Sequence, residues 1–222
     1  MAENKNLFIL GDSYSTFEGK IPADCETWYL SDYPDTRARQ TDVCKYEQTW
    51  VYQFLKESGN NLILNSSYSG TTICNTGYNG KDYTNISFIG RVRKLIKASF
   101  FEKNNIDKII VFGGTNDSWA DSPIGEIKYK GWSEKDLYYV LPAFGYLLYT
   151  LKESAPKAEI LCVINTELKA EISKGMKGTC SYLDIPYIEL ENIDKTVGHP
   201  NILGMKQIKD QIVSFMKQNK LL

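Results

Sequence analysis

The chain alternates short apolar segments with longer segments of helical pattern. Apolar runs of three to six residues are typical of strands covered on both faces, as in a parallel sheet. Because strands alternate with helices, we predict an α/β fold: a three-layer αβα sandwich around a doubly wound, parallel, five-stranded sheet. The predicted strands are 7–10, 62–65, 108–112, 159–164 and 187–189, and the predicted helices are 49–58, 86–101, 133–154, 167–183 and 203–217.

Length and composition narrow the class of protein. With 222 residues we expect one domain, residues 1–222. Hydrophobic residues make up 42% and charged residues 24%, which excludes a disordered chain. The net charge is −1 and there is no basic run, which argues against a nucleic-acid partner. No apolar stretch approaches the roughly 18 residues of a membrane-spanning helix, and the N-terminus lacks a secretory pattern, so we predict a cytoplasmic protein.

The five cysteines are an odd number without a C-x-x-C pair, and there is a single histidine. This pattern argues against a zinc site and against a full disulfide framework. We therefore predict no metal and expect reduced, packed thiols. One bridge, between Cys25 and Cys44, stays open because both residues lie in the same predicted loop.

Two long loops interrupt the alternation, at about 18–48 and 117–132. Loops of this length are uncommon in a compact domain and are often functional. Both follow predicted strands, so we expect both to border the same edge of the sheet. Their aromatic residues either stack on a substrate ring or anchor the loops on the domain, and both interpretations stay open: Trp28, Tyr29, Trp119, Tyr129 and Trp132.

Polar or glycine-containing turns follow four of the predicted elements. Ligands of doubly wound sheets bind beyond the carboxyl ends of the strands, where these turns converge. Acyl transfer needs such a group of residues: a nucleophile, a base, and donors aimed at a developing oxyanion. The turns are Gly11-Asp12-Ser13, the segment NSSYSGTTI at 65–73, the segment GGTND at 113–117, and the segment TVGHPN at 196–201.

These four segments, in this order, resemble the signature blocks of the SGNH hydrolase superfamily, the GDSL-type esterases and lipases, which have a flavodoxin-like fold. The resemblance implies that Ser13 is the nucleophile and that His199 is the general base. It also implies an oxyanion hole formed by the backbone N–H groups of Ser13 and Gly70 and by the side-chain amide of Asn116. Members of the superfamily hydrolyse esters or thioesters and use no cofactor.

The histidine segment departs from the usual pattern of the family, which is Asp-x-x-His. Thr196 stands three residues before His199, and the nearest upstream acid is Asp194. Two possibilities stay open: Asp194 orients the imidazole from a differently shaped loop, or a backbone carbonyl orients it and leaves a Ser–His dyad. Asp12 and Asp117 flank the signature residues, and we expect both to be structural, binding neighbouring backbone N–H groups or capping turns.

The leading hypothesis is therefore a serine esterase that acts on a small-molecule ester, with a short acyl group such as acetyl on a carbohydrate or another small polar alcohol. One alternative is a catalytically weak or inactive binding module for a carbohydrate or peptide, which the replaced aspartate at Thr196 favours. A second alternative is a lipase, lysophospholipase or thioesterase. A nucleotide-binding fold is excluded because neither a P-loop nor a dinucleotide-binding glycine motif follows the first strand.

Overall fold

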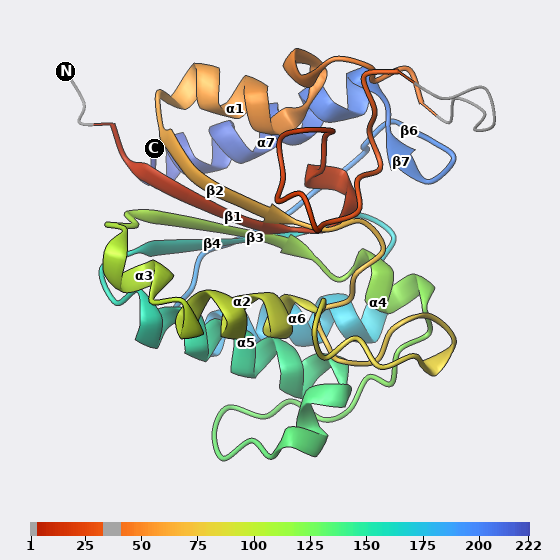
Figure 1. Cartoon of the computed structure of the whole chain (residues 1–222), viewed down its shortest axis with the longest axis vertical. Coiled ribbons are helices and arrows are strands. Elements are labelled where there is room, and N and C mark those ends of the chain that lie inside the picture. Colours follow the sequence, from red (N-terminus) through yellow and green to blue (C-terminus); the bar gives the residue numbers. More distant parts are fainter. Residues whose placement is uncertain (1–3, 33–40) are drawn as a thin grey trace.

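A parallel sheet of five strands forms the centre of the molecule (Figure 1). The computed structural model of the chain describes residues 4–32 and 41–222. All neighbouring pairs in the sheet are parallel, and the strand order is β2-β1-β3-β4-β5. The prediction of a doubly wound α/β sandwich is confirmed. The strands are β1 (Asn6–Gly11), β2 (Asn61–Ser67), β3 (Lys108–Gly113), β4 (Glu159–Ile164) and β5 (Tyr187–Glu189).

Helices cover both faces of the sheet (Figure 1). Side chains of a strand point alternately to its two faces, and accordingly Leu7 and Ile9 belong to one hydrophobic core while Phe8 and Leu10 belong to the other. The first core lies under α1 (Trp50–Ser58) and α7 (Ile202–Gln218). The second lies under α2 (Phe88–Lys97), α3 (Phe100–Lys103), α5 (Val140–Ser154) and α6 (Ala170–Tyr182).

Two predicted helices are each divided in the structure. The segment 86–101 forms α2 and then the short α3, because Ser99 between them adopts a left-handed conformation with φ of 54°. The segment 133–154 forms the 3-10 helix η4 (Glu134–Tyr138) and then α5, with Tyr139 extended between them. The first amides of α5 bond to the preceding loop rather than continuing from η4, since Val140 N–H donates to the carbonyl of Pro123.

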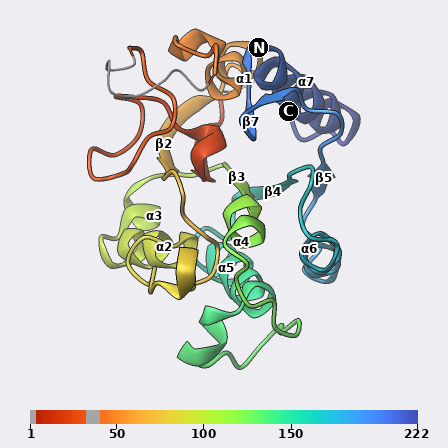
Figure 2. The same ribbon diagram turned by 90° about the vertical axis from the view of Figure 1, so that its right-hand side faces the viewer.

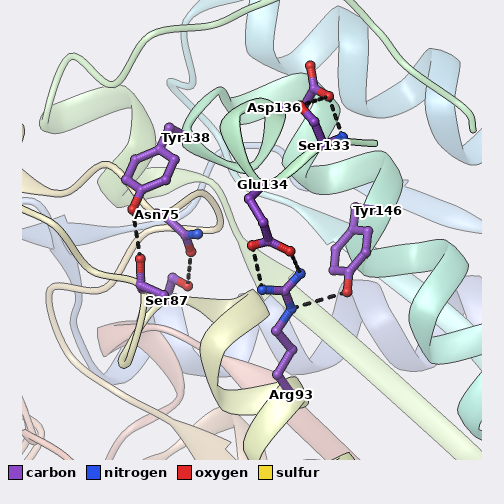
Figure 3. Close-up of polar contacts among 9 residues, drawn as sticks. Asn75, Ser87, Arg93, Ser133, Glu134, Asp136, Tyr138 and Tyr146 are labelled. Carbon is purple, nitrogen blue, oxygen red and sulfur yellow. Dashed lines mark hydrogen bonds and ion pairs between the residues drawn. The ribbon is translucent and has the colours of Figure 1, made fainter. Parts of the chain in front are cut away.

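The second long loop is fixed to the domain through η4 (Figure 3). Glu134 receives two hydrogen bonds of 2.8 Å from the guanidinium of Arg93 on α2, and Arg93 Nε donates to Tyr146 of α5 at 3.1 Å. Ser133 precedes η4, and its backbone N–H and its hydroxyl both donate to the carboxylate of Asp136. These contacts anchor the end of the loop on the outer helices.

The carboxyl ends of the strands lie at one edge of the molecule, which faces the viewer in Figure 2. The elements that carry three of the polar turns gather there, together with a 3-10 helix that follows the turn at 65–73. They are the 3-10 helices η1 (Ser13–Ser15) and η3 (Tyr78–Gly80), the helix α4 (Thr115–Trp119), and the hairpin of β6 (Lys195–Thr196) and β7 (His199–Pro200). One more 3-10 helix, η2 (Tyr46–Gln48), precedes α1. Within residues 4–32 and 41–222, no helix is long and apolar enough to span a bilayer.

Candidate active site

Ser13 lies in the first turn after β1, at the start of η1. Asp12 caps this turn, since its Oδ1 accepts the backbone N–H of Tyr14 at 3.1 Å. A side chain at Gly11 would collide with its neighbours: a Cβ there would lie 2.5 Å from Ser67 Oγ and 2.7 Å from Ser15 Oγ. Only glycine therefore fits at this position without a shift of these serine side chains. The tight turn leaves Ser13 buried, with 2% of its surface exposed.

Ser13 and His199 are in hydrogen-bond contact although 186 positions separate them. Ser13 Oγ lies 2.9 Å from His199 Nε2. On the other side of the ring, His199 Nδ1 lies 3.2 Å from the carbonyl oxygen of Val197. A carbonyl can only accept a hydrogen bond, so Nδ1 carries the proton and Nε2 presents its lone pair to the serine. This tautomer is the one in which imidazole can take a proton from a hydroxyl.

His199 begins the second strand of a tight hairpin. β6 and β7 pair with Thr196 opposite His199, and Val197 and Gly198 form the two-residue turn between them. Both turn residues have positive φ, 51° and 74°, as in the primed turns that favour asparagine and glycine. A β-branched residue such as Val197 is strained in this conformation. The turn directs the carbonyl of Val197 toward the imidazole.

Burial keeps the imidazole neutral. The pKa of His199 is lowered to about 4, chiefly by burial, with a further lowering by the charge of Lys195 and an opposing effect of the Val197 hydrogen bond. The ring is therefore unprotonated at neutral pH and is competent to act as a base.

Asn116 presents an amide with a free donor to the site. It lies on α4 and is buried, and its Nδ2 has no hydrogen-bond partner among residues 4–32 and 41–222. Its Oδ1 accepts a 2.8 Å hydrogen bond from the hydroxyl of Tyr78, on η3. Burying a donor without a partner is costly, and this amide is therefore available to donate to a further acceptor. Tyr78 was not predicted as a site residue, because nothing in its local sequence indicates this contact.

The segment that contains Gly70 is tied to α4. Asp117 accepts the backbone N–H groups of Ile73 and Cys74, with shortest distances of 2.9 and 3.2 Å. Burial raises the pKa of Asp117 to about 6, and burial is also the main cause of a raised pKa of about 7 for Asp12. The prediction of a bond to a neighbouring backbone N–H group is confirmed for Asp12. Asp117 also binds backbone N–H groups, but these belong to a segment 43 and 44 positions earlier in the chain.

Arg91 on α2 joins three segments beneath the site. Its NH2 donates to the carbonyl of Gly11 at 3.0 Å and to Thr71 Oγ1 at 3.3 Å, and its NH1 donates to the carbonyl of Ser66. The guanidinium is buried, and burial lowers its pKa to about 10. Arg91 thus holds the end of β1 against the segment that follows β2.

In the described part of the chain, four aromatic rings surround His199. The indole of Trp28 is stacked on the imidazole, with ring centroids 3.6 Å apart and planes at 8°. The rings of Tyr14, Trp119 and Tyr29 lie 5.3, 5.6 and 6.5 Å away at steeper angles. The other two aromatic residues singled out in the sequence lie elsewhere as loop anchors: Tyr129 stacks on Tyr182, and Trp132 packs on Tyr146 and Tyr149.

Asp194 is directed toward α7 and not toward the imidazole. Its Oδ2 accepts a 2.9 Å hydrogen bond from Gln207 Nε2, and its backbone N–H donates to Gln207 Oε1 at 2.7 Å. The contact with His199 Nδ1 is made instead by the Val197 carbonyl. Of the two possibilities for orienting the ring, the geometry matches the backbone carbonyl.

Among the described residues, the cysteines and acidic side chains form neither a disulfide nor a metal site. All five cysteines are free, including Cys25 and Cys44, so the bridge that the sequence left open is not formed. Among residues 4–32 and 41–222, no cluster of three or more His, Cys, Asp or Glu side chains could hold a metal ion. The eight residues 33–40 of the first long loop lie outside the described part of the chain.

Comparison with known proteins identifies the class. A sequence model described as GDSL-like lipase/acylhydrolase matches residues 5–216. The chain belongs to this family and is a hydrolase acting on ester bonds. No curated protein sequence matches it.

Two crystal structures of similar sequence have the same fold over almost their whole length. A Bacteroides uniformis protein described as a GDSL-like lipase shares 44% identity, with 98% of this chain and 97% of that chain covered and a TM-score of 0.89. A protein of the same description from Bacteroides ovatus shares 45% identity, with coverage of 97% and 99% and a TM-score of 0.88. An acetyl xylan esterase from the rumen bacterium Butyrivibrio proteoclasticus, 16% identical, shares the fold with a TM-score of 0.60, with 97% of this chain and 64% of that chain covered.

Proposed function

We propose that the protein is a serine esterase in which Ser13 and His199 act as a catalytic dyad. Ser13 Oγ attacks the ester carbonyl while its proton moves to His199 Nε2, and the same proton then passes to the leaving alkoxide, which departs as an alcohol. Water, deprotonated by Nε2, cleaves the acyl-enzyme and regenerates Ser13. The observation that supports this mechanism most directly is the 2.9 Å contact between Ser13 Oγ and His199 Nε2.

The proposed oxyanion hole consists of the backbone N–H groups of Ser13 and Gly70 and Asn116 Nδ2. Its support is the buried Nδ2 without a partner, held in position by Tyr78. A neutral amide is suited to this role because it stabilises a negative oxygen without giving up a proton. Removal of one such donor in other hydrolases lowers turnover by about 10² to 10³.

We further propose a short-acyl ester of a small polar alcohol, such as an acetylated carbohydrate, as the substrate. The support is the confinement of the nucleophile: Ser13 is 2% exposed and the ring beside it is covered by Trp28. A long acyl chain would require a contiguous apolar channel leading to the serine.

Two measurements test the proposal. Incubation with an organophosphonate, followed by intact mass, is expected to give one adduct on the wild type and none on Ser13→Ala; the absence of an adduct on the wild type would indicate a binding module. A series of p-nitrophenyl esters from acetate to dodecanoate is expected to give kcat/KM values that fall with chain length. Faster hydrolysis of the long esters would favour a lipase and refute the proposed substrate class.

A further inference from the structure

The imidazole of His199 has surroundings that oppose a positive charge, yet the proposed mechanism requires one. His199 is 5% exposed. The Nζ of Lys195 lies 5.7 Å from the centroid of Tyr14, whose ring is 5.3 Å from the imidazole. Lys195 is held there by Thr166 Oγ1 at 2.6 Å and by Glu167 at 3.1 Å. A carboxylate beside the imidazole would offset the charge, but the group on Nδ1 is the neutral carbonyl of Val197.

Among residues 4–32 and 41–222, the group best placed to offset this charge is the indole of Trp28. It lies face to face with the imidazole, with centroids 3.6 Å apart and planes at 8°. The face of an indole carries the negative part of the ring quadrupole and attracts a cation placed over it, most strongly where water is excluded. A stack in this geometry favours imidazolium over imidazole.

The segment that contains Trp28 is fixed to both halves of the dyad. The backbone N–H of Trp28 donates to Thr16 Oγ1 at 3.0 Å, and that hydroxyl donates to the carbonyl of Ser13 at 2.9 Å. The hydroxyl of Tyr29 donates to the carbonyl of Pro200, next to His199, at 2.9 Å. These bonds fix the position of the Trp28 segment relative to Ser13 and His199.

We propose that Trp28 is a positioning residue that stabilises the imidazolium of His199 during acyl transfer, in place of the aspartate that the chain lacks at Thr196. This inference rests on the proposed role of His199 as the general base. We therefore predict that the side chain at position 28 affects the stability of the His199 imidazolium and not the binding of the ester.

Methylboronic acid gives a direct test at pH 7. When it adds to Ser13, an Oγ–B bond forms, the boron becomes tetrahedral and anionic, and the hydroxyl proton moves to His199 Nε2. The complex therefore contains the imidazolium. We expect its affinity to fall about threefold in Trp28→Phe and about tenfold in Trp28→Leu, because phenyl is a weaker cation acceptor than indole and leucine has no ring face.

Two further readouts separate this role from a purely structural one. His199 is the sole histidine, so its ring protons give the only imidazole signals in the proton NMR spectrum. Titration of the boronate complex is expected to give an imidazolium pKa that is lower by about one unit in Trp28→Leu, which corresponds to the tenfold loss of affinity. The kcat for p-nitrophenyl acetate is expected to fall in the same order, with KM within about twofold of the wild type. Trp132→Leu, a matched substitution remote from His199, is expected to leave all three quantities unchanged.

Equal affinities and equal imidazolium pKa values in the Trp, Phe and Leu proteins would overturn the inference, and so would a rise in KM with kcat intact. Failure of the proposed function gives a different result. In that case Ser13→Ala would retain turnover or boronate affinity, whatever residue stands at position 28.

Discussion

The carbonyl oxygen of Val197 lies 3.2 Å from Nδ1 of His199 and holds the imidazole in the tautomer that faces Ser13. Val197 provides this carbonyl from a turn position with φ of 51°, where its branched side chain is strained and 67% exposed. The support for the ring is therefore a backbone group, so the side chain at position 197 can change without removing it.

Val197→Asn is expected to stabilise the protein by about 1 kcal/mol, because asparagine is favoured at the first position of this kind of turn. The expected kcat is within about twofold of the wild type, since the carbonyl remains. Urea unfolding measures the stability, and turnover of p-nitrophenyl acetate measures the activity. A stable variant with greatly reduced kcat would contradict the assigned role of the backbone.

Asp194→Asn is expected to change kcat/KM by less than about twofold, because its carboxylate binds Gln207 and not the imidazole. His199→Ala, measured in parallel, is expected to lower kcat by at least about 10⁴-fold. If the loss in Asp194→Asn approached that in His199→Ala, the protein would have a conventional triad in solution.

Tyr78→Phe removes the hydrogen bond that orients the amide of Asn116. We expect kcat to fall about tenfold, less than the roughly 10² to 10³ expected for Asn116→Ala. The double variant is expected to match Asn116→Ala alone, because Tyr78 acts through that amide. Additive losses in the double variant would mean that Tyr78 has an independent role.

The low pKa of His199, about 4, predicts activity in mildly acidic solution. Because the base is neutral above its pKa, kcat/KM for an uncharged ester is expected to fall to half near pH 4 and not near the ordinary histidine value of about 6.5. A pH–rate profile from pH 3.5 to 9 measures this. A half-point near 6.5 would show that the ring is more hydrated than its burial indicates.

The same low pKa predicts how stability depends on pH. The unfolded chain has the ordinary histidine pKa of about 6.5, so between about pH 6.5 and 4 it binds a proton that the folded protein does not bind. The contribution of His199 to the free energy of unfolding is therefore fully present above about pH 6.5 and is lost as the pH falls toward 4. From pH 7.5 to 5 we expect the wild type to lose about 2 kcal/mol more stability than His199→Phe. Comparing the two proteins separates the contribution of His199 from those of Asp12 and Asp117, which both proteins contain. The raised pKa values of these carboxyl groups change stability with pH in the opposite direction.

Two arginines of the same helix give a matched comparison. Arg91→Met is expected to lower the free energy of unfolding by at least about 3 kcal/mol, because it leaves the buried carbonyls of Gly11 and Ser66 with one donor fewer. Arg93→Met, which breaks the partly exposed pair with Glu134 in Figure 3, is expected to cost about 1 kcal/mol or less. Urea unfolding of the two variants measures both values, and equal losses would contradict the structural role of Arg91.

Local patterns were sufficient for the framework of the fold. The apolar runs predicted the five strands of the central sheet, and the predicted helix 49–58 matches α1. The sequence did not reveal the break between η4 and α5. There the amides of Val140 and Leu141 bond to the residues 123 and 124 of the preceding loop, and no periodicity within 133–154 indicates those partners.

The sequence by itself determined the parallel sheet, the edge at which the polar turns meet, and the residue types in those turns, because apolar periodicity and glycine turns are local properties. Only the tertiary structure decided which group supports His199, which hydroxyl orients Asn116, and which ring lies on the imidazole. Val197, Tyr78 and Trp28 took these positions through contacts between segments far apart in the chain or through a strained turn. Such contacts depend on how the folded segments pack, which no local pattern of residues specifies.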